Sequence, residues 1–175
     1  MGIPVRAAIA GLNRVRSAFR LLLVALWASA LGAQTGSIDL QANAGYACFV
    51  DEGFCDLPHF YTGSAAHFYL SRRWAFYPEF VFAKGPGVDH DYQLNANLSW
   101  TFGSSQRARP YWFFGAGAQL HRGPYGSGGW ALIFGGGFGV KAYVSKNVYV
   151  APEVRLGWEP FLRLGIGVGY TFGRR

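Results

Sequence analysis

The residues with the most evident chemical potential form the cluster Asp89-His90-Asp91. An imidazole between two carboxylates can act as a general base or supply half of a metal site. A solvated loop is the plainer interpretation of the same residues, and we favour it. A second catalytic candidate is the carboxylate pair Glu79 and Glu153, each of which follows a proline. The elements that hold these groups must decide which interpretation applies.

The N-terminal segment, residues 1–33, is typical of a secretory signal peptide. Arginines precede an apolar run at 21–28, which is shorter than the roughly 20 residues of a membrane-spanning helix. Small residues follow, so we predict cleavage after Ala33 and one mature domain at 34–175; an uncleaved N-terminal anchor is the alternative. The segment holds four of the 16 Lys and Arg residues. The mature chain is therefore only weakly basic, and we do not expect a nucleic-acid partner.

The two cysteines, Cys48 and Cys55, lie in the short segment CFVDEGFC. Exported chains enter an oxidising compartment, where an even number of cysteines predicts a disulfide. Closing so short a loop should stabilise the fold by about 2 to 3 kcal/mol. The alternative is a half-site for a metal ion that includes Asp51 and Glu52.

Polar and apolar residues alternate along most of the mature chain, as in strands that present one polar and one apolar face. The segment HDYQLNANLSWTFG, residues 90–103, shows the pattern most clearly. Turn residues divide the chain into eight such strands, at 37–47, 61–70, 74–83, 90–103, 111–121, 130–143, 148–156 and 161–172, with a Gly-rich loop at 123–129. Pro78 and Pro152 each remove a backbone donor inside a strand, so a bulge or a local break is expected at both.

The composition decides which face of these strands points outward. A soluble surface carries roughly a quarter to a third charged residues, whereas this chain has 14% charged and 18% aromatic residues. A membrane barrel accommodates this composition, because lipid covers its apolar wall and polar residues fill its interior. We therefore predict an all-β fold, an eight-stranded antiparallel up-and-down transmembrane β-barrel. Aromatic residues at the turn-side strand ends would form a girdle: Trp74, Trp100, Phe102, Tyr170 and Phe172.

Six charged side chains point into this barrel on the predicted register. They are Asp39, Glu79, Lys141, Glu153, Arg155 and Arg163. Buried charges are tolerated when they are paired and hydrogen-bonded, so we expect an interior polar network. The interior of an eight-stranded barrel is just wide enough for side chains to fill it. An open channel is therefore not expected, and a narrow pore remains an alternative.

The charges outside the strands sort to the two ends of the barrel. The short turns carry basic residues, whereas the longer loops carry the acids Asp51, Glu52, Asp56, Asp89, Asp91 and Glu159. With both barrel termini on the periplasmic side, these acids form an outer rim. We expect the rim to bind a cationic partner such as divalent ions; the alternative is that the acids only keep the loops solvated.

The turns Ser-Arg-Arg-Trp and Ser-Lys-Asn-Val, the closing Gly-Tyr-Thr-Phe and the alternation from Ser37 to Phe172 carry a resemblance to a known family. Over this range the chain resembles the outer-membrane protein β-barrel family, the small eight-stranded barrels that include the OmpA-like transmembrane domain. Members usually end on an aromatic residue, whereas here Phe172 is followed by Gly-Arg-Arg. The resemblance implies export to the outer membrane of a Gram-negative cell, insertion by the barrel-assembly machinery, and contact with outer-membrane lipid and lipopolysaccharide.

Some small barrels of this kind modify lipid A, and this chain lacks the motifs that the resemblance implies for such enzymes. No histidine is followed by a serine two residues later, and no aspartate directly precedes a serine. We therefore predict a structural or surface-interaction role, without catalysis and without a cofactor. The alternatives are a lipid A-modifying enzyme that uses Asp89, His90 and Asp91, and a narrow pore.

Overall fold

The computed structural model describes residues 37–49, 55, 57–103, 105, 107–123, 126–158, 160 and 162–173. The predicted signal peptide at 1–33 lies outside this part of the chain. The described residues form the strands β1 Ile38–Phe49, β2 Leu57–Tyr69, β3 Trp74–Lys84, β4 His90–Thr101, β5 Ala108–Gly123, β6 Gly126–Tyr143, β7 Val148–Trp158 and β8 Leu162–Phe172. No helix in this part of the chain is long and apolar enough to cross a membrane.

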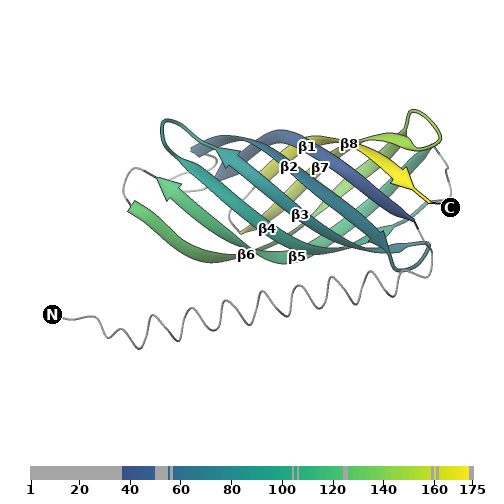
Figure 1. Ribbon diagram of the computed structural model, residues 1–175, viewed down its shortest axis with the longest axis horizontal. Helices are drawn as coiled ribbons and strands as arrows, with labels where there is room; N and C mark the ends of the chain where they lie inside the picture. The colour runs from purple at the N-terminus through teal and green to yellow at the C-terminus, as the bar shows by residue number, and fades with distance from the viewer. Residues whose placement is uncertain are drawn as a thin grey trace.

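The strands make one closed antiparallel sheet, inclined to the long axis of the molecule (Figure 1). Each strand pairs with its neighbours in sequence, and β8 returns to β1 with Phe172 opposite Ile38. The predicted eight-stranded antiparallel up-and-down barrel is therefore confirmed. Closure leaves no unpaired sheet edge. An open edge would be costly in an apolar surrounding, because its backbone groups would lack hydrogen-bond partners.

The two ends of the barrel differ in their connections. The turn end holds the β2–β3, β4–β5 and β6–β7 connections, the start of β1 and the end of β8; the loop end lies opposite. In each of the three turns, a serine hydroxyl accepts a hydrogen bond from the backbone N–H three residues further on. The donors are Trp74 to Ser71 at 3.1 Å, Ala108 to Ser105 at 3.2 Å and Val148 to Ser145 at 3.2 Å. Serine in these positions therefore fixes the tight turns.

The strand limits differ from the prediction most at the loop end. The predicted Gly-rich loop at 123–129 is wrong, because β5 continues to Gly123 and β6 begins at Gly126. Glycine-rich sequence lacks the side-chain alternation that identifies a strand, but its backbone groups pair normally once a partner is present. β2 likewise begins earlier than predicted, at Leu57, so His59 lies within the sheet.

The polar face of each strand points inward. In β4, Gln93, Asn95 and Asn97 are buried, whereas Tyr92 and Leu94 are 36% and 39% exposed. The register predicted for this strand is therefore confirmed. The same alternation continues around the barrel, so the outer wall is apolar and the interior holds amides, tyrosines and charged groups.

Aromatic side chains form a belt on the outer wall at each end of the barrel. At the turn end, contacts join Trp74, Trp100, Phe102, Trp112 and Phe138, and Tyr170 packs on Phe172. At the loop end, Tyr46 contacts Phe60, and Phe82 contacts His90 and Tyr92. On β4 the belts are eight residues apart, from Tyr92 to Trp100. This separation is about 26 Å along the strand and about 20 Å along the axis at the usual strand tilt.

Pro78 and Pro152 each interrupt the sheet on one side. Pairing of β3 with β2 skips two residue pairs at Pro78, and pairing of β7 with β6 skips two at Pro152. On its other side, each of these strands pairs through the proline without a gap. The predicted local break is confirmed, because the prolyl nitrogen has no hydrogen to donate.

Candidate functional site

The interior is organised first around Glu79, which β3 directs into the barrel. Its Oε2 lies 3.3 Å from Nη1 of Arg155 on β7, and its Oε1 accepts a hydrogen bond from Nη2 of Arg163 on β8. Asn95 donates to the same carboxylate at 3.3 Å. All four side chains are buried. The carboxylate is therefore paired with two guanidinium groups and hydrogen-bonded, as a buried charge requires.

Glu153 of β7 forms a second interior group, with neutral donors. The hydroxyls of Tyr77 and Tyr111 donate to it, the former at 3.2 Å, and Gln41 Nε2 donates at 2.7 Å. Glu79 and Glu153, which the sequence offered as a catalytic alternative, are thus each held by their own donors in the interior of the barrel.

Asp39 of β1 and Lys141 of β6 form the third interior group. Lys141 Nζ lies 2.7 Å from Asp39 Oδ2, and the Tyr69 hydroxyl donates to the same oxygen at 2.7 Å. The ammonium group also lies 5.0 Å from the centre of the Tyr149 ring. A Cβ at Gly169, opposite Tyr149 in the ladder, would overlap that ring, so glycine makes room for it.

These groups join strands on opposite sides of the barrel. In a closed sheet of eight strands, β3 and β7 are diametrically opposed, yet Glu79 contacts Arg155 and Tyr77 contacts Glu153. The six residues predicted for the interior take part in these groups: Asp39, Glu79, Lys141, Glu153, Arg155 and Arg163. We call them the lumen network. Its three carboxylates match its three cations, and its side chains cross the full width of the barrel.

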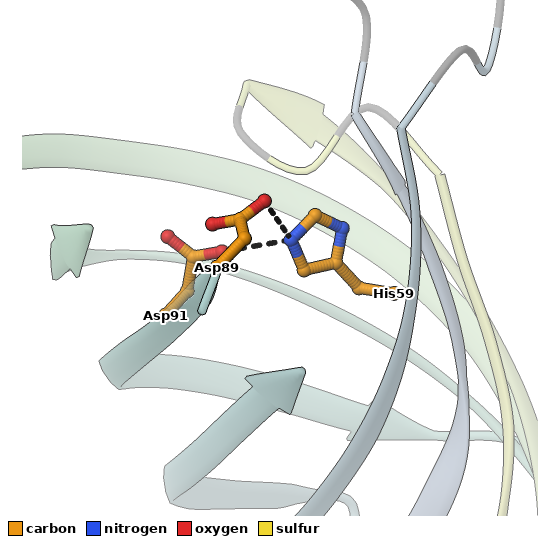
Figure 2. A group of neighbouring side chains, drawn as sticks. All are labelled: His59, Asp89 and Asp91. Carbon is orange, nitrogen blue, oxygen red and sulfur yellow. Dashed lines mark ion pairs between the residues drawn. The ribbon is translucent and has the colours of Figure 1, made fainter. Parts of the chain in front are cut away.

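A different cluster lies at the loop end of the interior. His59 Nε2, from β2, is 3.1 Å from Asp89 Oδ2 and 3.4 Å from Asp91 Oδ2 (Figure 2). His121 Nδ1, from β5, is 2.9 Å from Asp91 Oδ1 and 3.6 Å from Asp89 Oδ1. Two imidazoles therefore flank two carboxylates. We call these four residues the mouth cluster.

Neighbouring strands align the mouth cluster. Asp91 of β4 is directly opposite His121 of β5 in the ladder. His59 reaches the carboxylates across Gly85, which follows β3, and a Cβ there would collide with His59 Nε2 and Asp89 Oδ2. The carbonyl of Asp89 accepts a hydrogen bond from the Gly85 N–H at 3.0 Å, which fixes the turn between β3 and β4. A single glycine therefore both leaves the space and anchors the turn.

The mouth cluster runs from buried to exposed side chains. Asp91 and His59 are 1% and 2% exposed, Asp89 is 14% exposed and His121 is 48% exposed. Gln119 also donates to Asp91, at 3.1 Å. Imidazole nitrogens and carboxylate oxygens accept protons and ligate divalent metal ions. The cluster therefore places such donor atoms beside the half-exposed His121 at the loop end.

Comparisons with known proteins bear on the fold. No protein-family model matches the chain, and no curated protein matches it significantly. Neisserial surface protein A aligns with a TM-score of 0.66 at 17% identity, over 78% of this chain and 99% of that one. The N-terminal β-barrel domain of Pseudomonas aeruginosa OprF aligns with a TM-score of 0.61 at 17% identity, over 79% of this chain and 98% of that one. Ail, the attachment invasion locus protein of Yersinia pestis, aligns with a TM-score of 0.54 at 12% identity, over 79% of this chain and 100% of that one.

This chain has the fold of the small outer-membrane β-barrels. On this outer-membrane barrel fold, the predicted Cys48–Cys55 disulfide is present, with the two Cα atoms 5.0 Å apart. Cys48 is opposite Pro58 in the β1–β2 ladder. The disulfide therefore closes the loop end directly beside His59.

The predicted outer rim of the barrel is only partly described. Asp51, Glu52, Asp56 and Glu159 lie outside the described residues. The predicted place of Asp91 on an exposed rim is wrong, because its side chain points into the barrel and is buried. β4 begins at His90, so the alternation that turns Gln93 inward turns Asp91 inward too. The solvated-loop interpretation is therefore wrong for Asp91.

The alternative grouping of His90 with its two neighbouring aspartates, as a general base or half of a metal site, is not assembled. His90 faces outward, where its ring contacts Phe82 and Tyr92, and its Nδ1 lies 2.8 Å from the Val88 carbonyl oxygen. As a member of the loop-end aromatic belt, His90 is separated by the sheet from the interior side of β4.

His59 and His121 contact the carboxylates of Asp89 and Asp91 in place of His90, and sequence reasoning missed both. Because every second residue of a strand lies on the same face, counting outward from the buried residues could have found them. His121 shares its face with Gln119, and His59 shares its face with Tyr61, both of which are buried. Each histidine was overlooked because it lies at the edge of, or outside, the predicted limits of its strand.

Proposed function

We propose that this chain is an integral outer-membrane barrel with a structural or surface-interaction role and no reaction of its own. The inverted polarity of the barrel carries this proposal. Leu132, Ile166 and Val168 are 73%, 53% and 55% exposed on a wall bounded by the aromatic belts, while ion pairs and amides fill the interior. Such a wall is stable when hydrocarbon covers it. The belt separation of about 20 Å is close to the apolar band of about 25 Å in such barrels.

We further propose that the loop end faces the cell exterior and the turn end faces the periplasm. Ile38 and Phe172, the ends of the described sheet, both lie at the turn end. This placement suits an exported chain inserted by the barrel-assembly machinery. The turns also carry the exposed Arg72, Arg73 and Lys146. In this orientation, outer-membrane lipid surrounds the wall and lipopolysaccharide phosphates surround the loop end.

A surface role is favoured over a pore because the lumen network occupies the barrel. The contact of Glu79 with Arg155 and that of Tyr77 with Glu153 span opposite strands. A solute would have to separate buried, charge-paired groups to pass, which is energetically costly. We therefore propose that the barrel does not conduct.

The names of structural neighbours support a surface role as a class. They include a surface protein and an attachment invasion locus protein, and the latter has also been solved with the heparin analogue sucrose octasulfate. The loop end of this chain, by contrast, holds two neighbouring carboxylates, the partly exposed Asp89 and the buried Asp91. We therefore propose a cationic ligand, in contrast to a polyanion.

Location and conduction are tested separately. A peptide tag inserted between Asp51 and Glu52 is expected to be accessible to antibody on intact cells. Accessibility only after rupture of the outer membrane would contradict the proposed orientation.

In planar bilayers, the purified protein is expected to give no discrete conductance steps, and regular steps would support a pore instead. The mass of lipid A is expected to be the same with and without the protein.

A further inference from the structure

The mouth cluster has the geometry of a ligand set. One donor atom from each of His59, Asp89 and Asp91 lies within 4.8 Å of the others. The two nitrogen-to-oxygen distances from His59 Nε2 are 3.1 and 3.4 Å. A zinc ion held at about 2.0 to 2.1 Å by tetrahedral ligands separates those ligands by about 3.3 Å. The separations of His59 Nε2 from the two carboxylate oxygens are therefore already close to those of ligands that share one ion (Figure 2).

The charges at the mouth cluster also favour a cation. Two carboxylates face one another with limited solvent, an arrangement that disfavours their shared ionised state. No lysine or arginine ion pair to Asp89 or Asp91 occurs among the described residues. The nearby Lys84 is directed elsewhere, because its Nζ binds the carbonyl oxygens of Gly87 and Asp89. A divalent cation would neutralise both carboxylates at once.

The ligands are held in place before any ion binds. His59 packs against the Phe49 ring, with ring centres 4.6 Å apart. Gly85 leaves the space in which His59 Nε2 meets Asp89 Oδ2, and Gln119 holds Asp91 at 3.1 Å. Preorganised ligands lower the cost of binding, because fewer side chains must be ordered.

His121 has a different place from the other three residues. It contacts the Oδ1 atoms of Asp91 and Asp89, whereas His59 contacts their Oδ2 atoms. It therefore lies on the other side of the carboxylate pair and is half exposed. From there it can orient both carboxylates, as groups bonded to metal ligands commonly do.

We propose that His59, Asp89 and Asp91 form a binding site for one divalent first-row transition metal ion such as Zn²⁺, with His121 orienting the two carboxylates. An imidazole ligand favours zinc-like ions over Ca²⁺ and Mg²⁺, which prefer oxygen alone. Three protein ligands leave a fourth tetrahedral position for a water molecule. A bound ion also ties β2, the β3–β4 turn and β4 together, so it stabilises the loop end.

The test measures Zn²⁺ binding to the purified, chelator-treated protein folded in detergent, by calorimetric titration. The wild type is expected to bind one Zn²⁺ per chain. His59→Gln and Asp91→Asn should weaken binding by more than the roughly 10- to 100-fold typical of losing a group that supports a ligand, whereas His121→Gln should fall within that range. His90→Gln is the matched control, because it removes a histidine from the same end of the barrel on the outer face. It should bind as the wild type does.

Folding of each variant is checked by its faster migration in unheated gel samples. If His59→Gln does not fold, Gly85→Ala serves instead, because it keeps every ligand and places a methyl group against His59 Nε2 and Asp89 Oδ2. This variant should also lose Zn²⁺ binding. Equal Zn²⁺ affinity in the wild type and in folded Asp91→Asn would overturn the proposal. So would a Ca²⁺ affinity equal to that for Zn²⁺. The metal site rests on the cationic ligand proposed above, and neither result bears on the outer-membrane location or on the absence of conduction, which the tag and the planar bilayer test separately.

Discussion

The lumen network and the mouth cluster use similar side chains in different ways. In the lumen network three carboxylates meet three cations, and each charged group is buried or held by buried donors. In the mouth cluster the two carboxylates contact two imidazoles and the Gln119 amide, with no lysine or arginine ion pair among the described residues, and His121 is half exposed. The charges of the first region are therefore matched without a ligand, whereas the second has two carboxylates and no lysine or arginine paired with them among the described residues.

This difference separates a structural polar group from a binding site. When each charge of a buried ion pair is already matched, no charge is left for a ligand to neutralise. Such a pair is therefore weak evidence of a binding site, although removing one partner leaves the other charge buried and unpaired. A cation bound between two unmatched carboxylates, in contrast, lowers their free energy because it reduces the repulsion between them. Charge balance, more than the presence of titratable residues, therefore distinguishes the two regions of this barrel.

The largest effect should follow from unbalancing the lumen network. Glu79→Gln leaves Arg155 and Arg163 without their shared carboxylate, so it should lower the free energy of unfolding by about 3 to 5 kcal/mol. Urea titration of the protein folded in lipid vesicles measures this change. If Glu79→Gln left the free energy of unfolding unchanged, charge matching would not distinguish the lumen network from the mouth cluster.

A somewhat smaller loss is expected from a charge on the wall that surrounds both regions. Leu98 lies on β4 beside the inward-facing Asn97 and faces outward. Leu98→Arg should cost about 2 to 4 kcal/mol in a bilayer, because the charge is placed in hydrocarbon. Leu98→Phe keeps the wall apolar and is the control. Similar unfolding curves for the two variants would mean that Leu98 does not face lipid.

Removal of the disulfide should affect the mouth cluster and spare the lumen network. A double change, Cys48→Ser with Cys55→Ser, should cost about 2 to 3 kcal/mol by the chain-entropy estimate. Because the crosslink lies beside His59, amide hydrogen exchange should rise at the loop end of β1 and β2 and stay slow around Glu79. Uniformly faster exchange through the barrel would show that the two regions are not separable.

The alternation of polar and apolar residues predicted the fold and the inward direction of all six members of the lumen network. It could not predict their partners, because Asp39 and Lys141 meet across the barrel through its closure, 102 residues apart in sequence. The mouth cluster was missed for a local reason. His59 precedes the predicted start of its strand. His90 was grouped with its neighbours in sequence, although adjacent side chains in a strand point to opposite faces of the sheet.

The smallest effect should come from neutralising a carboxylate of the mouth cluster without metal. Asp91→Asn keeps an oxygen that can accept from Gln119 and removes one of two neighbouring negative charges. The gain from reduced repulsion offsets the weaker hydrogen bonds, so the free energy of unfolding in chelator should change by only about 1 kcal/mol or less. Unfolding of Asp91→Asn beside Glu79→Gln, in the same vesicles, measures the contrast. A loss in Asp91→Asn as large as that in Glu79→Gln would mean that the histidines already neutralise the mouth cluster.

Added Zn²⁺ sharpens the same contrast and reverses the roles of the two variants. When the free Zn²⁺ concentration is about 100 times the dissociation constant, the bound ion stabilises the fold by about 2.7 kcal/mol. Glu79→Gln keeps His59, Asp89 and Asp91, so it should gain this stabilisation just as the wild type does. Asp91→Asn should gain almost none of it. A stabilisation common to both variants would show that Zn²⁺ acts elsewhere on the protein, whereas its absence from Asp91→Asn alone would tie metal binding to the unmatched carboxylates.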